Sequence, residues 1–450
     1  MSKRAVLMMV CLLLLAAGAA SAEQYVLSAP GKWKASNSAA VAAAGGTLVW
    51  SHGGSGLGVA TSSNPNFLAN LQAAGGFQSA AADMMVEWQM PTPVEEASVD
   101  PSDDTFASLQ WAPGAIDAPG AWAAGCTGAG VRVAVIDGGI YNAHPDLDAN
   151  VDTACSASFV PGQPYNNDTG TFWHGTHVAG IIAAEDNTIG VVGIAPDATI
   201  IGVKALHGGS GSFGAVIGAI LYAADPAAFG AGSCARADII NMSLGAAFFK
   251  AGGAGPLLGP LAHAVNYAAS KGVLVVSAAG NNGLDLGQAS SITVVPAESG
   301  SGLAVSATGP VAWAYGATNF SRPASYSNYG EGTISVAAPG GDFVYPGSED
   351  CTMPLNGPPG TITRPCWVFD LVLSTSRGTT AAGGYSWAAG TSMASPAAAA
   401  VAALIKGATP GISLGALKTA LFQSADDEGP IGHDEFYGHG FVNAFRACTE

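Results

Sequence analysis

Charged side chains are scarce in this chain of 450 residues, and basic ones are the scarcest. Only 10% of the residues are charged, with 15 Lys and Arg against 32 Asp and Glu, which gives a net charge of −17. Nucleic acid and anionic membrane surfaces repel a protein of this sign, so we exclude both as partners. The apolar content of 49% and the 62 glycines exclude a disordered chain and indicate a loop-rich globular protein.

The sequence also lacks a long apolar run that would anchor it in a membrane. The one apolar stretch near the start extends from Ala5 to about Ala17, follows Lys3 and Arg4, and leads to a segment of small residues at 20–22. A membrane span needs about 20 apolar residues, so this pattern is instead typical of a cleaved signal peptide. We predict a signal peptide over residues 1–22 and a secreted, extracellular protein without a membrane anchor.

Cysteines occur in no metal-binding pattern, because there is no CxxC pair and no Cys/His cluster. Once residues 1–22 are removed, an even number remains in an oxidising compartment, which allows up to three disulfides. These cysteines are Cys126, Cys155, Cys234, Cys351, Cys366 and Cys448. Cys351 and Cys366 share one insertion rich in Pro and Gly, so we predict that they pair with each other; the partners of the other four remain open.

The length of the chain and the change in its pattern of apolar residues predict two folded units. Residues 23–90 follow the order of a split βαβ sandwich of ferredoxin type. Its predicted elements are strand 24–28, helix 36–44, strands 47–52 and 57–62, helix 66–74 and strand 84–89. Residues 91–108 begin acidic and Pro-rich without apolar periodicity, which predicts an exposed linker that proteases can cut.

From residue 109 to 450, short apolar runs alternate with helical patterns and Gly-rich loops. This alternation predicts an α/β fold, in which helices cover both faces of a parallel sheet. The predicted strands are 131–136, 199–203, 239–242, 273–277, 302–306 and 333–337, and the predicted helices are 175–184, 214–224, 261–269 and 395–404. Functional side chains in such folds gather at the carboxyl ends of the strands.

Three segments carry side chains suited to nucleophilic catalysis. Asp137 directly follows the buried run VAVI, His174 opens HGTHVAG, and Ser392 lies in GTSMASP at the start of a helix. Singly, each has a structural explanation, since an acid after a strand caps turns and a histidine at this place caps or packs a helix. Together they contain a nucleophile, a base and a carboxylate that can orient the base, and a helix entrance favours developing negative charge.

In this order, Asp then His then Ser, the three segments resemble the active-site signatures of the subtilisin-like serine proteases. The resemblance spans about residues 111–444 and implies a serine endopeptidase that acts on polypeptides, with Ser392 as nucleophile, His174 as general base and Asp137 orienting it. It also implies that Asn281, in SAAGN, donates to the oxyanion. Residues 23–90 resemble the family's inhibitory propeptide, so we expect a self-processing zymogen and a monomeric enzyme.

The resemblance extends to the substrate-binding segments. NMSLG places Ser243, Leu244 and Gly245 on one wall of the first specificity pocket, and Ala278, Ala279 and Gly280 on the opposite wall. Backbone pairing with an extended peptide would explain broad acceptance of substrates. The chain departs from the family at Val294, where a Gly is common at the base of this pocket, and the insertion 346–368 has no counterpart that we can align.

A calcium site is implied by the same resemblance. The segment 185–191 is similar to the family's calcium loop, which suggests backbone carbonyls of Glu185, Ile189 and Val191 with the side chains of Asn187 and Asp146 as ligands. The family's Gln ligand near the mature N-terminus has no counterpart, because Ala107 stands there. Asp103 and Asp104 are alternative donors, and an ordinary surface turn is the alternative explanation of the loop.

Two other functions compete with an active endopeptidase. One is a catalytically dead relative kept for binding, which loss of any of the four predicted catalytic residues would favour; all four are present. The other is ligation or ester hydrolysis through the same acyl-enzyme, which the sequence does not separate from proteolysis.

Overall fold

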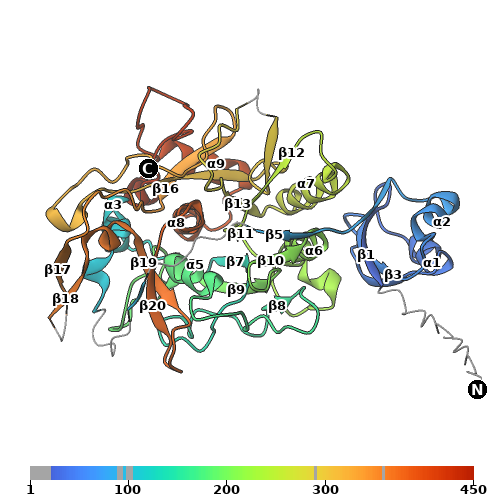
Figure 1. Ribbon diagram of the computed structural model, residues 1–450, viewed down its shortest axis with the longest axis horizontal. Helices are drawn as coiled ribbons and strands as arrows, with labels where there is room; N and C mark the ends of the chain where they lie inside the picture. The colour runs from blue at the N-terminus through green and yellow to red at the C-terminus, as the bar shows by residue number, and fades with distance from the viewer. Residues whose placement is uncertain (1–21, 89–94, 98–104, 288–290, 357–359) are drawn as a thin grey trace, which may run out of the picture.

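The computed structural model describes residues 22–88, 95–97, 105–287, 291–356 and 360–450. The predicted signal peptide and most of the predicted linker therefore lie outside the described residues. The described chain forms a small N-terminal module and a larger domain beside it, connected through strand β5 (Figure 1). None of the helices in these ranges is long and apolar enough to span a bilayer.

The N-terminal module, residues 23–82, has four antiparallel strands in the order β2-β3-β1-β4. Its elements are β1 (Glu23–Ser28), α1 (Ala35–Ala43), β2 (Thr47–Ser51), β3 (Leu57–Ser62), α2 (Phe67–Ala74) and β4 (Ser79–Ala82). Alternation along β1 sends Tyr25 and Leu27 toward Phe67 and Leu71, which form the module's own core. The order of strands and helices is the one that the sequence predicted.

The last strand of the module was predicted at the wrong place. Residues 79–82, Ser-Ala-Ala-Ala, form the fourth strand, although alanine has weak β-propensity. The predicted segment 84–89 does contain a strand, β5 (Met85–Glu87), but β5 pairs with β10 (Ser210–Ser212) of the larger domain. Its apolar residues mark a strand correctly, and only the tertiary structure decides which sheet it joins.

The larger domain contains a seven-stranded sheet in the order β16-β15-β13-β11-β7-β9-β8, in which all pairs are parallel. Its strands are β7 (Arg132–Asp137), β8 (Ala157–Ser158), β9 (Thr199–Lys204), β11 (Ile239–Met242), β13 (Leu274–Ala278), β15 (Leu303–Thr308) and β16 (Ile334–Pro339). The six predicted strands are confirmed to within three residues at each end. The short β8 was not predicted.

Helices cover both faces of this sheet. Val133 and Val135 of β7 pack on the side of α5 (His174–Ala183) and α8 (Thr391–Ala408), whereas Ala134 and Ile136 pack on the side of α6 (Phe213–Ala224) and α7 (Gly255–Ser270). Residues 133–136 of the strand are all apolar because both of its faces are buried. The α/β architecture is therefore confirmed.

Smaller elements surround this frame. They are α3 (Trp111–Ala115), α4 (Ala118–Ala123), α9 (Leu414–Gln423), α10 (Ala444–Thr449), the pairs β12 (Ala246–Phe249) with β14 (Ile292–Val295) and β17 (Asp350–Pro354) with β18 (Thr361–Pro365), and the hairpin β19 (Val372–Ser376) with β20 (Gly384–Ala388). Short 3₁₀ helices span Ala107–Leu109, Pro226–Phe229, Trp313–Tyr315 and Cys366–Asp370.

Part of the predicted linker has regular structure. Strand β6 (Glu95–Ala97) pairs antiparallel with β20, where we had expected an exposed segment without secondary structure. The free edge of the β19–β20 hairpin offers backbone N–H and C=O groups that any extended segment can pair with, whatever its sequence.

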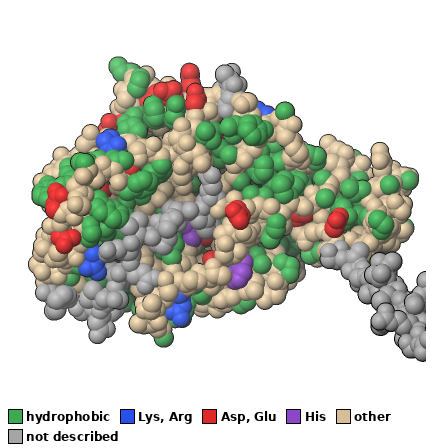
Figure 2. All heavy atoms as spheres, in the orientation of Figure 1, with side chains coloured by type: hydrophobic (Ala, Val, Ile, Leu, Met, Phe, Trp, Pro, Cys, Tyr) green, Lys and Arg blue, Asp and Glu red, His purple; other side chains and the backbone are tan. Residues whose placement is uncertain are grey.

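Three disulfides join Cys126 to Cys448, Cys155 to Cys234 and Cys351 to Cys366, which confirms the predicted pair. On the face shown in Figure 2, basic side chains are few and dispersed and form no patch, in agreement with the acidic composition.

Candidate active site

The structure brings Asp137 and His174 together at one edge of the sheet. Asp137 is the last residue of β7, and His174 is the first residue of α5. The Nδ1 of His174 lies 2.8 Å from Oδ2 and 3.0 Å from Oδ1 of Asp137. A carboxylate at this place holds the proton on Nδ1, so Nε2 of the neutral ring keeps its lone pair. Nε2 is buried and has no hydrogen-bond partner among the described residues, and it is therefore available as a base.

The turn before His174 is held in an uncommon conformation. Trp173 has a φ of 46°, which few residues other than glycine adopt. Its ring makes an edge contact with Tyr141, and the Arg377 guanidinium lies 4.2 Å from the centre of the Tyr141 ring. These contacts hold the strained turn in place and thereby fix the entrance of α5, where His174 begins the helix.

Ser392 lies at the amino end of α8 and is almost fully buried. Its hydroxyl donates to the backbone oxygen of Ser243 at 3.0 Å, and the hydroxyl of Ser243 donates back to the carbonyl of Ser392 at 2.8 Å. Asn241 continues this network, because it donates to Ser243 Oγ at 3.0 Å and accepts from Ser395 Oγ at 2.7 Å. The network attaches the start of α8 to the carboxyl end of β11.

Asn281 is oriented by Thr391, the residue before Ser392. The amide oxygen of Asn281 accepts hydrogen bonds from the backbone N–H and the hydroxyl of Thr391, both at 2.8 Å. The same hydroxyl accepts from the N–H of Gly280 at 3.0 Å. Because the oxygen of the amide is committed to Thr391, the Nδ2 donor points away from it. The positive end of the α8 dipole lies beside Thr391 as well.

The two predicted substrate-binding segments lie next to each other. Ser243, Leu244 and Gly245 follow β11, whereas Ala278 ends β13 and is followed by Ala279 and Gly280. Because β11 and β13 are neighbours in the sheet, their carboxyl ends emerge side by side near Ser392. Leu244 is buried in the apolar cluster of α6, so its side chain supports the segment from behind.

Sequence reasoning missed Lys204, which lies beside Asp137 in the sheet. Its buried ammonium group donates to the backbone oxygens of Gly138 and Asn167, the latter at 2.7 Å, and lies 4.0 Å from Oδ1 of Asp168. Burial lowers the pKa of Lys204, although Asp168 and Asp137 oppose this, and burial raises the pKa of Asp168. The sequence signal that could have identified Lys204 is a single basic residue directly after the mostly apolar run 199–203.

The predicted calcium loop wraps around Asp146. The Asp146 carboxylate accepts from the N–H of Val191 at 3.0 Å, and its backbone oxygen accepts from the N–H of Glu185 at 3.0 Å. Asn187 donates to the carbonyl of Pro145 at 3.3 Å and accepts from the N–H of Ile189 at 2.9 Å. Asp146 therefore contacts the turn 185–191 at both ends, and the donor atoms predicted for all five residues are oxygens, as calcium requires.

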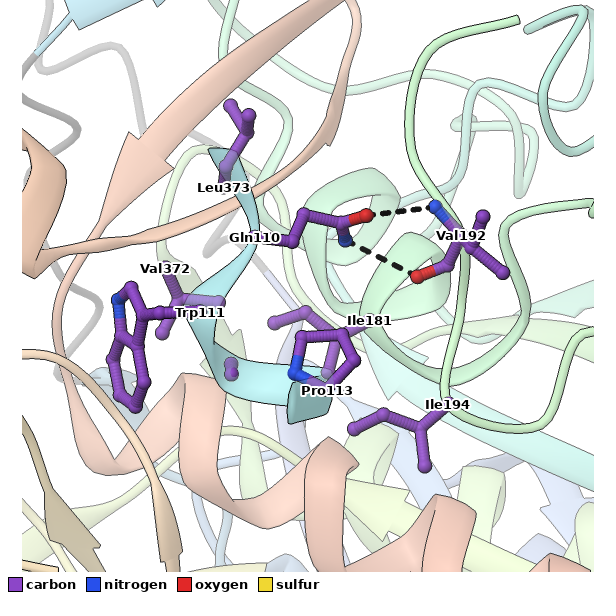
Figure 3. Close-up of a pocket in the computed structure, with 9 residues that line it drawn as sticks. Gln110, Trp111, Pro113, Ile181, Val192, Ile194, Val372 and Leu373 are labelled. Atoms are coloured by element: carbon purple, nitrogen blue, oxygen red, sulfur yellow. Dashed lines mark hydrogen bonds between the residues drawn. The ribbon is translucent and has the colours of Figure 1, made fainter. Parts of the chain in front are cut away.

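Gln110, three residues after Ala107, is held by Val192 and is not available to this loop. The side chain of Gln110 donates to the backbone oxygen of Val192 at 3.1 Å and accepts from the backbone N–H of Val192 at 2.9 Å (Figure 3). Ala107 lies in a 3₁₀ helix, and Asp103 and Asp104 lie outside the described residues. Across the ranges that the structure describes, no three His, Cys, Asp or Glu side chains are grouped to hold a metal. Any ion here would depend largely on backbone carbonyls.

Comparison with known proteins gives consistent matches over the larger domain. Residues 128–440 match the profile of the Subtilase family. The chain is 36% identical over 343 residues to Subtilisin Savinase from Lederbergia lenta, an alignment that covers 76% of this chain and 98% of the relative. The crystal structure of a lanthipeptide protease shares 27% identity at a TM-score of 0.62, over 76% of this chain and 96% of its own.

A further match extends into the N-terminal module. The epidermin leader peptide processing serine protease from Staphylococcus aureus superposes with a TM-score of 0.71 at 21% identity, over 95% of this chain and 98% of its own. An overlap of this extent includes the module as well as the larger domain. At this level of identity the match concerns the fold alone.

Proposed function

Because this chain belongs to the subtilase family of serine endopeptidases, we propose that it hydrolyses peptide bonds of polypeptides through an acyl-enzyme on Ser392. His174 acts as general base and then as general acid, and Asp137 orients the imidazole and stabilises its charged form. Asn281 and the amino end of α8 stabilise the oxyanion of the tetrahedral intermediate.

The hydrogen bonds of His174 and Ser392 support these roles. The Ser392 hydroxyl, which now donates to the Ser243 carbonyl, turns toward Nε2 of His174, gives up its proton and attacks the scissile carbonyl. The imidazolium then protonates the leaving amine, and water hydrolyses the ester by the same proton route. Hydrogen bonds between a nucleophile and its general base commonly tighten only when substrate binds. The observation that carries the proposal is the contact of 2.8 Å between His174 and Asp137 at the edge where α8 presents Ser392.

A labelling experiment tests this assignment. The purified protein is incubated with denatured casein, with and without a fluorophosphonate that modifies activated serines. We expect the fluorophosphonate to stop digestion and peptide mapping to find it on Ser392. Digestion that continues with Ser392 fully labelled would contradict the proposal.

We also propose that residues 23–90 are an inhibitory propeptide and that the enzyme cuts itself within the linker 91–108. Strand β5 supports this, because this extended segment, which follows residues 23–82, adds to β10 of the larger domain as a bound peptide would. Beyond β5, Trp88 donates from its backbone to Gly209 and from its indole to Gly211, both at 3.0 Å. The N-terminal sequence of the mature enzyme tests the cleavage position.

Secretion and a structural calcium ion complete the proposal. Export through a signal peptide over residues 1–22 is consistent with the three disulfides, which persist in oxidising compartments. Calcium would be held by Asp146, Asn187 and the carbonyls of Glu185, Ile189 and Val191, and would stabilise the loop after α5. We propose a monomer, which light scattering of the mature enzyme tests.

A further inference from the structure

The ammonium group of Lys204 connects the two segments that carry the catalytic acid and base. Lys204 is the last residue of β9 and lies beside Asp137, the last residue of β7, in the parallel sheet. Its side chain is fully buried, and Nζ donates to the backbone oxygen of Gly138 and, at 2.7 Å, to that of Asn167. Gly138 directly follows Asp137, whereas Asn167 lies in the loop that leads to His174. One cation therefore fixes both segments.

The residues that follow Lys204 hold the backbone of Asp137 as well. The carbonyl oxygen of Asp137 accepts from the N–H of Ala205 at 2.9 Å and from that of Leu206 at 3.2 Å. The Asp137 carboxylate accepts from the N–H of Gly138 at 2.6 Å, and Lys204 holds the same residue through its carbonyl. The orientation of the Asp137 carboxylate therefore depends on contacts made by the end of β9.

Two carboxylates face this ammonium group. Asp137 is 1% exposed, and Oδ1 of the largely buried Asp168, in the loop before α5, lies 4.0 Å from Nζ of Lys204. Asp168 also accepts from the N–H of Gly208 at 2.9 Å and lies 3.6 Å from Nδ1 of His207. Charges in a protein interior are screened weakly, so two neighbouring carboxylates need a cation to offset their repulsion. Lys204 supplies this cation beside the catalytic pair.

A positive charge beside Asp137 also acts on His174. Nδ1 of His174 lies 2.8 Å from Asp137, and a carboxylate at this distance attracts the charged form of the ring. The base must be neutral when substrate binds, because a protonated imidazole cannot accept the proton of Ser392. The ammonium group of Lys204 repels a second positive charge and thus favours the neutral ring.

We propose that Lys204 is a positioning residue of the catalytic centre, which holds the Asp137 carboxylate against His174 and whose charge keeps the imidazole neutral in the free enzyme. This inference rests on the proposed function and assigns to that reaction a residue that acts through Asp137. A neutral residue in place of Lys204 should lower kcat. It should also move the acid limb of the pH profile of kcat/KM, which reports protonation of the base in the free enzyme, to higher pH.

Three substitutions separate the charge of Lys204 from its hydrogen bonds. Lys204→Met removes both, Lys204→Gln keeps an N–H donor without the charge, and Lys204→Arg keeps both. Lys418→Met is the matched control, because Lys418 is also partly buried and donates to a backbone oxygen, that of Ser301. Ser301 precedes the amino end of β15 and therefore lies at the edge of the sheet opposite Asp137.

The variants are compared on a tetrapeptide nitroanilide between pH 5 and pH 9. Active sites are titrated with the fluorophosphonate, so that loss of folded enzyme enters neither kcat nor kcat/KM. A misplacement of about 1 Å costs roughly 10²-fold, so we expect kcat of Lys204→Met to fall by about 10–100-fold and that of Lys204→Gln by less. The acid limb of both should rise by roughly one pH unit. Lys204→Arg and Lys418→Met should keep the wild-type limb.

Asp168 can hide the lost charge by taking up a proton. Burial raises the pKa of Asp168 and Lys204 opposes this, so the carboxyl gains a proton more readily once the ammonium group is absent. The comparison is therefore repeated in an Asp168→Asn background, in which this uptake is impossible. There Lys204→Met should raise the acid limb by at least as much as it does in the wild-type background.

An acid limb of Lys204→Met that coincides with that of its parent in both backgrounds overturns the inference, even when kcat falls, because Lys204 then supports only the fold. An unchanged kcat of Lys204→Met overturns it as well. If Lys204→Met does not fold, Lys204→Gln decides. A wild-type enzyme without turnover contradicts the proposed function instead. In that case proton NMR of His174 in the Ser392→Ala chain decides, and the ring should take up its proton at higher pH when Lys204 is replaced.

Discussion

The N-terminal module and the larger domain bury their apolar side chains in different ways. The larger domain covers both faces of its sheet with its own helices. The module covers one face of β1 and β3 with α1 and α2, whereas Val26 and Val59 on the other face join the apolar cluster of α6. In Figure 1 the module accordingly lies at one end of the molecule, against α6 and α7.

The predicted catalytic residues are confined to one of these two regions. All four predicted catalytic residues and the hydrogen bonds that orient them belong to the larger domain. The module supplies none of them, and the strand that follows it, β5, pairs with β10. We therefore expect substitutions in the larger domain to change turnover and substitutions in the module to change how tightly it is held.

The largest effect is expected from Ser392→Ala. Without the nucleophile, turnover on casein should fall by a factor on the order of 10⁶, and the chain should keep its residues 23–90. Ser413→Ala, which removes the cap of α9, is the control and should retain activity. Activity assays and mass spectrometry of the purified chains measure both results. Self-processing of Ser392→Ala at the normal rate would contradict the assignment.

Asn281→Ala should have the next largest effect. The substitution removes an oxyanion donor and leaves Asp137, His174 and Ser392 in place, so we expect kcat to fall roughly 10²–10³-fold with KM nearly unchanged. Asn443→Ala, at the start of α10, provides an asparagine control remote from the site. Steady-state kinetics on a short peptide measure kcat and KM of both variants. A change confined to KM would instead indicate that Asn281 acts in ground-state binding.

Just after β5, Trp88→Ala should weaken docking of the module without changing the chemistry. Trp88 is 3% exposed and packs against Phe213, whereas Met85, three residues earlier, is 68% exposed. Truncating a buried Trp costs about 3 kcal/mol or more, which corresponds to roughly 100-fold weaker docking. Hydrogen exchange of residues 23–82 in the Ser392→Ala background measures this, with Met85→Ala as the control. Equal protection in the two variants would show that Trp88 does not hold the module.

A smaller effect should follow from pH. His52, directly after β2, is buried against the rings of Phe229 and Tyr267. Its Nε2 lies 3.5 Å from the carboxylate of Asp225, which also forms an ion pair with Lys271. Burial lowers the pKa of His52 from its ordinary value of 6.5; Asp225 opposes this shift, and Lys271 adds to it. The docked state thus prefers the neutral ring. The contribution of His52 to docking is therefore fully present above pH 6.5 and decreases as the pH falls below that value.

The same hydrogen-exchange measurement at pH 8 and pH 5 tests the role of His52. In the Ser392→Ala chain, residues 23–82 should lose protection at the lower pH, and His52→Gln should reduce the difference. Docking that becomes tighter on acidification would mean that the attraction of Asp225 for the protonated ring outweighs the cost of burying its charge.

The smallest effect should come from calcium. A ligand that binds only the folded state adds about 2.7 kcal/mol of stability at a hundredfold excess over its Kd. Chelation should therefore lower the melting temperature of the mature enzyme and accelerate its self-digestion, with nearly unchanged initial turnover on a short peptide. Melting curves that superimpose in millimolar calcium and in excess chelator would favour an ordinary surface turn at residues 185–191.

The sequence by itself determined much of the larger domain. Strands buried on both faces are largely apolar, so runs such as 133–136 located the sheet, and the parallel order placed Asp137 and the segments after β11 and β13 at one edge. The pairing of Cys351 with Cys366 followed from their proximity along the chain. These features depend on local pattern or on short separation.

Only the tertiary structure decided which surfaces meet. Strand β5 has the pattern of a strand but joins β10 rather than the module, and β6 pairs with β20 although its own sequence is acidic, because backbone groups at a free strand edge accept any extended partner.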